Sequence, residues 1–190
     1  MMNLQEKYRK EVIPALRKEF ALKNVMAVPR LEKAIVHTGV GKIREDKDQQ
    51  EIRKFLGIIT GQKPVARAAK KSIAAFKTRQ GLVIGYQVTL RGRRMYDFLS
   101  RLVAVALPRT RDFRGIREST CDGRGNLTIG VREHIVFPEM IGEDYRLLFG
   151  MEVTVVTTAK RREHGIALLK MIGFPLTEDK SEKIKDNIRR

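Results

Sequence analysis

The sequence is poor in the residues that disulfides, metal clusters and membrane spans require. One cysteine, Cys121, stands in 190 residues, so neither an internal disulfide nor a cysteine metal cluster can form, which fits a reducing cytosol. No apolar run approaches the ~20 residues of a membrane-spanning helix. The first residues, MMNLQEKYRKEV, are too charged for a signal peptide. We therefore expect a cytoplasmic protein with no membrane partner.

Acidic residues are missing from the most basic part of the chain. The stretch Ile52 to Tyr96 holds no Asp or Glu and eleven basic residues: Arg53, Lys54, Lys63, Arg67, Lys70, Lys71, Lys77, Arg79, Arg91, Arg93 and Arg94. Such a positive field repels itself and costs folding free energy, so a polyanionic partner is its natural explanation. A face that only kept the protein soluble would normally mix both signs of charge.

The composition of the whole chain points to the same kind of partner. Lys and Arg total 39 against 22 Asp and Glu, which gives a net charge of +17, and 42% hydrophobic residues argue against disorder. A basic globular protein of this size most often binds nucleic acid, and a membrane surface is the second candidate.

The motifs of catalysis are also absent. The sequence GVGK at residues 39–42 is followed by Ile43, where a phosphate-binding loop needs Ser or Thr. Cys121 precedes Asp122, whose charge is expected to raise the pKa of the thiol and so disfavour a nucleophile. The histidines are isolated in sequence and predict surface or strand residues rather than metal ligands: His37, His134 and His164. We expect no enzyme, no cofactor and no metal site.

Helical periodicity recurs in four segments, each with an expected boundary residue. These are Leu4–Phe20 with a kink or break at Pro14, Asp48–Thr60 ended by Gly61, Met95–Ala106 stopped by Pro108, and a last helix from its N-cap Thr158 to Gly173.

Alternating or β-branched segments predict strands between these helices. The expected strands are Glu32–Thr38, Val83–Arg91, Leu127–Phe137 and Glu152–Thr158, with a basic loop between Gly61 and Gly81 and an acidic loop over Pro138–Gly150. Strands and helices do not alternate strictly, so we expect an α+β fold: an antiparallel sheet with helices packed on one face and the other face open. We place Gln87, Thr89, Arg91 and Thr154 on the open face. Residues 1–175 are expected to form one domain, and residues 176–190 a charged tail.

The open face favours RNA over DNA as the partner. The sequence shows no zinc finger, leucine zipper or RRM aromatic signature, and its charge is not concentrated on one helix that could enter a major groove. Duplex RNA presents a wide, shallow minor groove with 2′-hydroxyls, which suits a sheet face of Thr and Gln flanked by Arg and Lys. Composition and spacing alone therefore predict a protein that binds structured RNA.

Seven segments, in order, carry a resemblance to a known family. They read NVMAVPRLEKAIVHTGVG, ITGQKPVARAAKKSIAAFKTRQG, VTLRGRRMYDFL, LPRTRDFRGI, DGRGN, IVFPE and VTVVTTAK. This set closely resembles the bacterial fifth large-subunit ribosomal protein family, which binds 5S rRNA, from the first helix to about Pro175. The resemblance implies the same α+β fold and a structural role on the ribosome, without catalysis.

The resemblance also implies three contact regions. Residues facing 5S rRNA, in the central protuberance beside large-subunit rRNA and other proteins of that region, would be Asn24, Val25, Met26, Gln62, Lys63, Thr89, Arg91 and Gly92. A loop reaching the P-site tRNA would comprise Lys71, Ser72, Ile73, Ala74, Ala75, Phe76, Lys77, Thr78 and Arg79. An intersubunit contact to small-subunit ribosomal protein thirteen would involve Arg109, Arg111, Asp112, Phe113, Arg114, Gly115, Phe137, Glu139 and Tyr145.

Some residues depart from the family pattern, and two other functions stay open. The family usually has Glu at Arg93 and Phe at Cys121, and often Asn at His37. An RNA-modifying enzyme on a basic platform would need a cofactor pocket, for which the sequence has no motif. A DNA-binding regulator would prefer duplex DNA to 5S rRNA of equal length.

Overall fold

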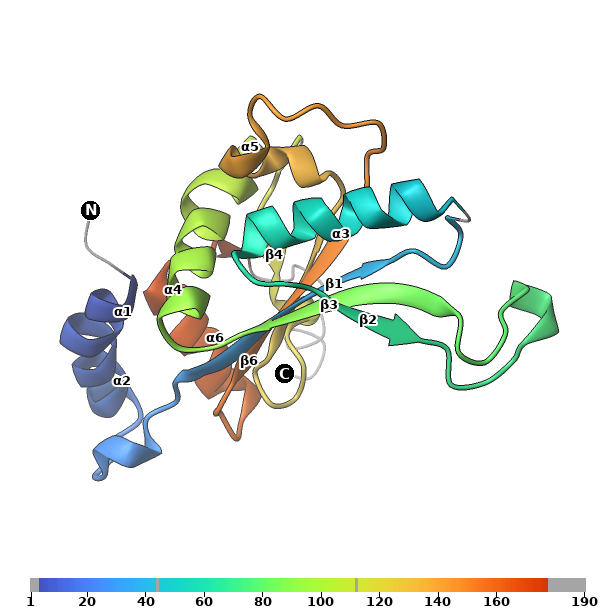
Figure 1. Cartoon of the computed structure of the whole chain (residues 1–190). Helices are drawn as coiled ribbons and strands as arrows, with labels where there is room; N and C mark the ends of the chain where they lie inside the picture. Colours follow the sequence, from blue (N-terminus) through green and yellow to red (C-terminus); the bar gives the residue numbers. More distant parts are fainter. Residues whose placement is uncertain (1–3, 44, 112, 178–190) are drawn as a thin grey trace.

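A five-stranded antiparallel sheet organises the chain in the computed structural model, which describes residues 4–43, 45–111 and 113–177 (Figure 1). The strands lie in the order β2-β3-β1-β6-β5. Their bounds are Val65–Ala68 for β2, Val83–Leu90 for β3, Leu31–Gly39 for β1, Met151–Thr157 for β6 and Leu127–Val131 for β5. The helices share one core with this sheet, which confirms the predicted α+β class.

The core lies against the face of the sheet that carries the aliphatic side chains. Val36 of β1 stands opposite Val88 of β3 on one side and Val153 of β6 on the other, and all three are buried. The helices cover this face with buried side chains that include Leu16, Phe55, Phe98 and Leu168. Side chains that alternate with this set are half-buried or exposed, so the opposite face of the sheet is open, as the alternation predicts.

Two helical segments pass through a proline by means of a π-helical turn. The first runs as α1 (Leu4–Lys7), the π turn η1 (Tyr8–Val12) and α2 (Ile13–Glu19), with the turn just before Pro14. The second runs as α4 (Gly92–Arg101), the π turn η4 (Leu102–Ala106) and α5 (Leu107–Arg109), so the prediction that Pro108 stops the helix was wrong. A wider π turn displaces the carbonyl that would clash with the proline ring, and the helix continues.

The other two long helices end as predicted, but one begins differently. Helix α3 (Asp46–Thr60) ends at Gly61, and helix α6 (Arg162–Ile172) ends at Gly173, both in left-handed conformation with φ of 66° and 119°. The prediction that Thr158 caps α6 was wrong. Its backbone N–H donates to the Arg30 carbonyl oxygen, and its hydroxyl accepts from the Arg30 N–H, which prolongs the β1–β6 pairing.

The remaining elements are short. They are the 3₁₀ turns η2 (Val25–Ala27), η3 (Ala74–Phe76), η5 (Glu118–Thr120), η6 (His134–Val136) and η7 (Pro138–Met140), and the parallel pair β4 (Ile116–Arg117) and β7 (Leu176–Thr177). Strand β5 stops at Val131, six residues before its predicted end, because the chain turns to bury His134 in the core. Residues 178–190 of the expected tail lie outside the described residues.

Candidate RNA-binding interface

Two rows of polar side chains cross the open face of the sheet. One row contains Thr128, Thr154, Ile35 and Thr89, on β5, β6, β1 and β3; the next contains Gly130, Glu152, His37, Gln87 and Val65. The Thr128 and Thr154 hydroxyls are 3.3 Å apart, and Arg67 Nε donates to Gln87 Oε1 at 2.8 Å. The face therefore offers hydroxyl and amide groups, which can both donate and accept, to a flat ligand.

The strand register brings the predicted 5S rRNA residues to one end of the sheet. Because β1 and β3 are antiparallel with Ala34 opposite Leu90, the start of β1 and the end of β3 lie together. The segment Asn24–Met26 leads into the start of β1, while Thr89 stands at the end of β3. The Gln62 side-chain amide donates to the Thr89 carbonyl oxygen at 3.3 Å, which holds the start of the β2 connection against the same end.

The segment Asn24–Met26 is a capped turn that presents apolar side chains to solvent. The Asn24 side-chain oxygen accepts a hydrogen bond from the Met26 N–H at 2.8 Å, which starts η2. Met26 is 79% exposed, so its side chain is available to a partner rather than to the core. Burial raises the pKa of Tyr8 to about 12, which keeps its hydroxyl protonated as the donor to the Pro29 carbonyl oxygen at 3.1 Å. That bond ties the chain after η2 to the first helical segment.

The turn from β3 into α4 forms the basic corner of this end. Gly92 has φ of 56°, a left-handed conformation that other residues adopt at a cost, and Arg91 before it is exposed. The side chain of the N-cap residue, Arg91, makes no capping hydrogen bond to the start of α4. The first backbone N–H groups of α4 therefore point outward beside Arg91, an arrangement that favours a phosphate.

The predicted basic loop is an arm built on a strand. Between Gly61 and Gly81, β2 pairs with β3 as the edge strand of the sheet, so the loop prediction was wrong for Val65–Ala68. The pairing continues outward, since the Ala69 N–H donates to Leu82 O at 2.8 Å and the Gly81 N–H donates to Ala69 O at 3.0 Å. Every residue of β2 is exposed, so backbone hydrogen bonds rather than buried side chains hold this strand.

The tip of the arm is a closed hairpin with an apolar end. Ile73 and Thr78 exchange both backbone hydrogen bonds, at 3.0 and 3.2 Å, around η3. Phe76 at this end is 74% exposed. The predicted tRNA-contacting residues, from Lys71 to Arg79, thus project from the end of β3 opposite to Arg91.

The residues predicted for the intersubunit contact divide into exposed and buried ones. Arg109, Arg111, Arg114 and Tyr145 are exposed, whereas Phe113 and Gly115 are half-buried. Phe137 is buried and stacks on Phe98 with ring centroids 5.8 Å apart, so its side chain supports the core. Glu139 forms an ion pair with Arg101. Asp112 lies outside the described residues.

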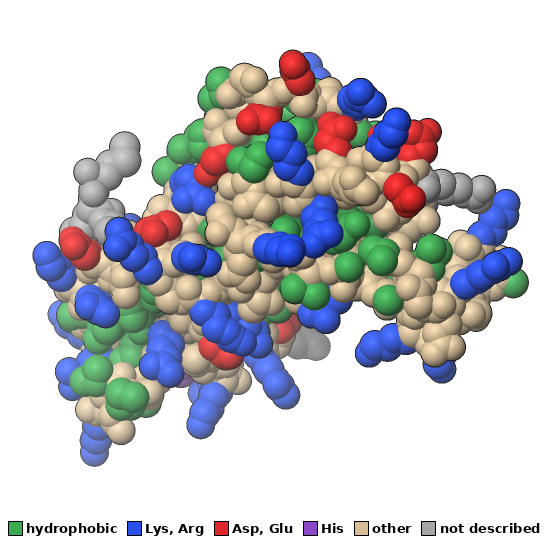
Figure 2. Space-filling view, in the orientation of Figure 1, with side chains coloured by type: hydrophobic (Ala, Val, Ile, Leu, Met, Phe, Trp, Pro, Cys, Tyr) green, Lys and Arg blue, Asp and Glu red, His purple; other side chains and the backbone are tan. Residues whose placement is uncertain are grey.

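Charge is distributed unevenly over the surface seen in Figure 2. Acidic side chains gather in the upper part, over α3 and the neighbouring loop, while the projecting arm shows Lys and Arg only. The sequence predicted the acid-free arm directly. It did not predict the uncapped start of α4, because a missing cap can be recognised only once the helix boundary is known.

His134 is the titratable residue that sequence reasoning misplaced, because it is neither at the surface nor in a strand. It is buried and stacks on Phe149 with ring centroids 4.2 Å apart, while Tyr145 meets it edge-on at 5.5 Å. Burial holds the pKa of His134 below its usual value, against weaker opposing effects of the Phe149 N–H and Glu51. Burial also raises the pKa of the Cys121 thiol, with Asp122 a lesser contributor, so the predicted direction was right.

Metal and membrane sites were sought among the described residues. In the described ranges, no three His, Cys, Asp or Glu side chains gather closely enough to hold a metal ion. None of the described helices has the length and apolarity to cross a membrane.

Comparison with known proteins places the chain in a family. Residues 24–79 match the family described as ribosomal protein L5, and residues 83–176 match the C-terminal part of that family, which is described separately. The large ribosomal subunit protein uL5 of Chloroflexus aurantiacus is 51% identical over 178 residues, which cover 93% of this chain and 99% of the relative. The chain belongs to the ribosomal protein L5 family.

Further relatives in the L5 family show the same extent of similarity. The uL5 protein of Roseiflexus sp. is 52% identical over 176 residues, covering 92% of this chain and 98% of the relative. That of Alkaliphilus metalliredigens is 46% identical over 179 residues, covering 94% and 100%. The chain is accordingly a structural ribosomal protein of the large subunit and not an enzyme. The two L5 family matches share one sheet, since β1 and β2 fall in the first and β3, β5 and β6 in the second.

Proposed function

We propose that this protein anchors 5S rRNA in the central protuberance of the large subunit, on cytoplasmic ribosomes. The end of the sheet where Asn24–Met26, Gln62, Lys63 and Thr89–Gly92 meet would hold the RNA. The observation that carries this proposal is the β1–β3 register, which gathers residues separated by more than sixty positions into one exposed, acid-free corner. Large-subunit rRNA and other proteins of the protuberance are the expected neighbours.

The chemistry of this corner suits duplex RNA. Arg91, Lys63 and the uncapped N–H groups of α4 supply positive charge for phosphates. Thr89 and Gln87 supply groups that can hydrogen-bond 2′-hydroxyls across a shallow minor groove. The exposed Met26 side chain adds apolar contact with a ribose or a base edge. Charge, hydroxyl chemistry and shape therefore favour the same ligand.

The arm is proposed to contact the P-site tRNA. It extends from the sheet on paired backbone strands, and its tip combines Lys71, Lys77 and Arg79 with the exposed ring of Phe76. Cations attract the phosphates of the tRNA elbow, and an exposed ring can stack on a base or ribose. A projecting loop on a rigid sheet is well suited to a partner that comes and goes.

A third surface is proposed to meet small-subunit ribosomal protein thirteen across the subunit interface. Arg109, Arg111 and Arg114 offer positive charge along the 109–115 segment, and Tyr145 offers an exposed ring on the acidic loop. The two charge signs lie on different segments, so this surface can pair with charges of both signs on a partner.

Hydrogen–deuterium exchange with and without 5S rRNA tests the 5S assignment. We expect protection at Asn24–Met26 and at Thr89–Gly92, with the arm tip Ile73–Thr78 unprotected. Competition with duplex DNA of equal length should leave the complex intact, because the 2′-hydroxyl contacts are lost on DNA. Protection confined to the arm, or equal competition by DNA, would contradict the proposal; the second result would favour a DNA-binding regulator.

A further inference from the structure

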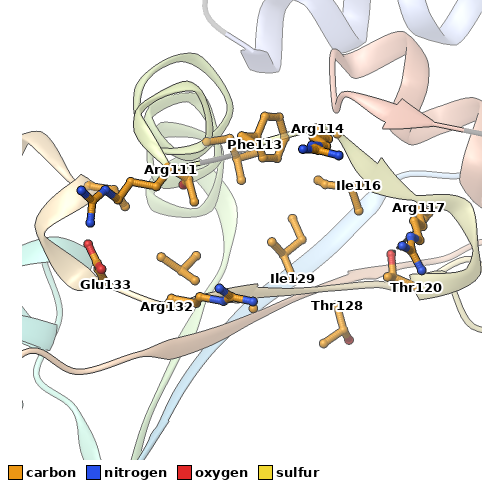
Figure 3. A pocket seen from close by; sticks show the side chains of 16 residues that line it. Arg111, Phe113, Arg114, Ile116, Arg117, Thr120, Thr128, Ile129, Arg132 and Glu133 are labelled. Carbon is orange, nitrogen blue, oxygen red and sulfur yellow. Dashed lines mark hydrogen bonds between the residues drawn. The ribbon is translucent and has the colours of Figure 1, made fainter.

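A second basic surface lies away from the proposed RNA corner, in a groove beside the last strand of the sheet. The groove has a volume of about 1010 Å³. Figure 3 shows its two walls: the segment from Arg111 to Arg117 forms one, and β5 with the residues after it forms the other. Neither wall contributes to the predicted 5S rRNA or tRNA contacts.

The groove runs along the free edge of β5. Six consecutive residues, Thr128–Glu133, line it. Since successive side chains of a strand point to opposite faces, a groove lined by all of them must follow the strand's edge. Strand β5 is the last strand of the sheet, and among the described residues its only outward pairing is the bridge from Leu127 to Cys121 at its start.

Gly130 presents unpaired backbone groups to this groove. The Asn126 carbonyl oxygen accepts from Asp122 N–H on the outer edge, and backbone groups of alternate residues point to the same edge, so those of Gly130 point outward. Within the described residues they have no hydrogen-bond partner on that side. A Cβ added at Gly130 would meet no atom within 4 Å, so the space beside the edge is open.

The groove is positively charged over an apolar floor. Its arginines are exposed, form no ion pair with any described carboxylate, and face a single lining carboxylate, Glu133; they are Arg111, Arg114, Arg117 and Arg132. The floor consists of buried aliphatic side chains: Ile116, Ile129, Val131 and Val136. An occupant with acidic groups on one side and apolar groups on the other would match both.

We propose that this groove binds an acidic, extended segment of another protein, which adds a strand to the sheet at the β5 edge. In an extended segment, side chains alternate, so acidic ones would meet the arginines while apolar ones rest on the floor. Its backbone would pair with Gly130. An RNA strand could use the arginines, but it has neither the repeating amide N–H and C=O groups for the edge nor aliphatic groups for the floor. Part of one wall, Arg111 to Gly115, is shared with the proposed intersubunit surface, but the inference does not depend on RNA binding.

The edge pairing is tested with a labelled peptide of about ten residues that alternates Glu and Val, measured by fluorescence anisotropy. Gly130→Pro removes the outward N–H donor while an edge strand tolerates proline, and should weaken binding about tenfold. The matched control Gly130→Ala keeps the N–H and should stay within about twofold of the parent protein. A peptide that does not bind, or that binds Gly130→Pro as well as Gly130→Ala, overturns the strand addition.

The charge requirement is tested with a variant that does not touch the backbone. Arg114→Gln with Arg132→Gln changes two exposed side chains and should weaken Glu–Val peptide binding by about tenfold or more. A Lys–Val peptide should not bind the parent protein. The double variant should bind 5S rRNA as the parent does; loss of 5S rRNA binding, or tighter groove binding of single-stranded RNA than of the peptide, would make the groove an RNA site and overturn the inference.

Discussion

The two ends of strand β3 are built in opposite ways. At the Arg91 end, Leu90 and Val88 are 0% and 1% exposed and pack against the helices. At the arm end, Val65 opposite β3 is 57% exposed, and Phe76 at the tip is 74% exposed. One continuous strand thus runs from a packed core into a projection held mainly by backbone hydrogen bonds (Figure 1).

This difference indicates how one small domain can serve a permanent and a transient partner. A corner fixed by the core holds its groups in one arrangement, which suits RNA that stays bound. An arm with few buried contacts opens and adjusts at low free-energy cost, which suits a partner that moves. Both ends are basic, so charge alone does not distinguish them; packing does.

The largest expected effect is on stability, and it falls on one end only. Leu90→Ala should lower the free energy of unfolding by about 2–5 kcal/mol, because it leaves a cavity in the core. Val65→Ala, the matched arm variant, should change it by no more than about 0.5 kcal/mol. Urea denaturation followed by circular dichroism measures both. Equal losses would mean that the arm shares the core's packing.

A smaller effect is expected on RNA affinity. Arg91→Ala should weaken 5S rRNA binding by about 1–3 kcal/mol, the scale of losing a charge-assisted contact in a packed interface. Lys77→Ala, which removes a charge of the same sign from the arm tip, is the control and should have little effect. Filter binding at fixed salt compares the two. Unchanged affinity in a folded Arg91→Ala protein would remove this residue from the site.

The salt dependence should also separate the two ends. The affinity for 5S rRNA should fall steeply as salt rises, because Lys and Arg release counterions from phosphates. Lys63→Ala should reduce the slope of log affinity against log salt by about 1, and Lys77→Ala should leave it unchanged. A slope near zero for the parent protein would contradict the electrostatic account of the acid-free stretch.

The smallest expected effect is a pH dependence confined to the core. Because burial holds the pKa of His134 below 6.5, the unfolded chain takes up a proton first as the pH falls. Stability from this residue is full above pH ~6.5 and is lost as the pH falls toward the lower, folded-state pKa. His134→Phe keeps an aromatic ring and should remove this part of the pH dependence, as thermal unfolding at several pH values would show. Residues 65–82 contain no His, Asp or Glu, so local opening of the arm, measured by amide exchange corrected for its intrinsic rate, should not follow it.

The elements with strong periodicity could be predicted from the sequence. Strand β3, helix α3 and its stop at Gly61 follow from alternation, a 3.6-residue period and a left-handed glycine. Strand β2 could not be predicted, because all its side chains are exposed and only backbone pairing with β3 defines it. Pro108 failed as a stop signal because a π turn precedes it.

The candidate site was predictable only in part for a similar reason. Acid-free composition identifies the arm, and alternation identifies Thr89 as facing away from the core. The proximity of Asn24–Met26 to Thr89 depends on the β1–β3 register, which no local pattern encodes. The arginine groove depends on two segments meeting beside β5, and neither segment has a motif of its own.

The most direct test of the division between the two ends is to replace Ser72–Thr78 with glycines and measure both partners. We expect the affinity of the isolated protein for 5S rRNA to stay within about twofold, which is less than about 0.5 kcal/mol. Ribosomes assembled with the same protein should retain P-site tRNA less well than those with the parent protein. Loss of 5S rRNA binding by a folded variant, together with normal tRNA retention on any ribosomes that incorporate it, would contradict the account.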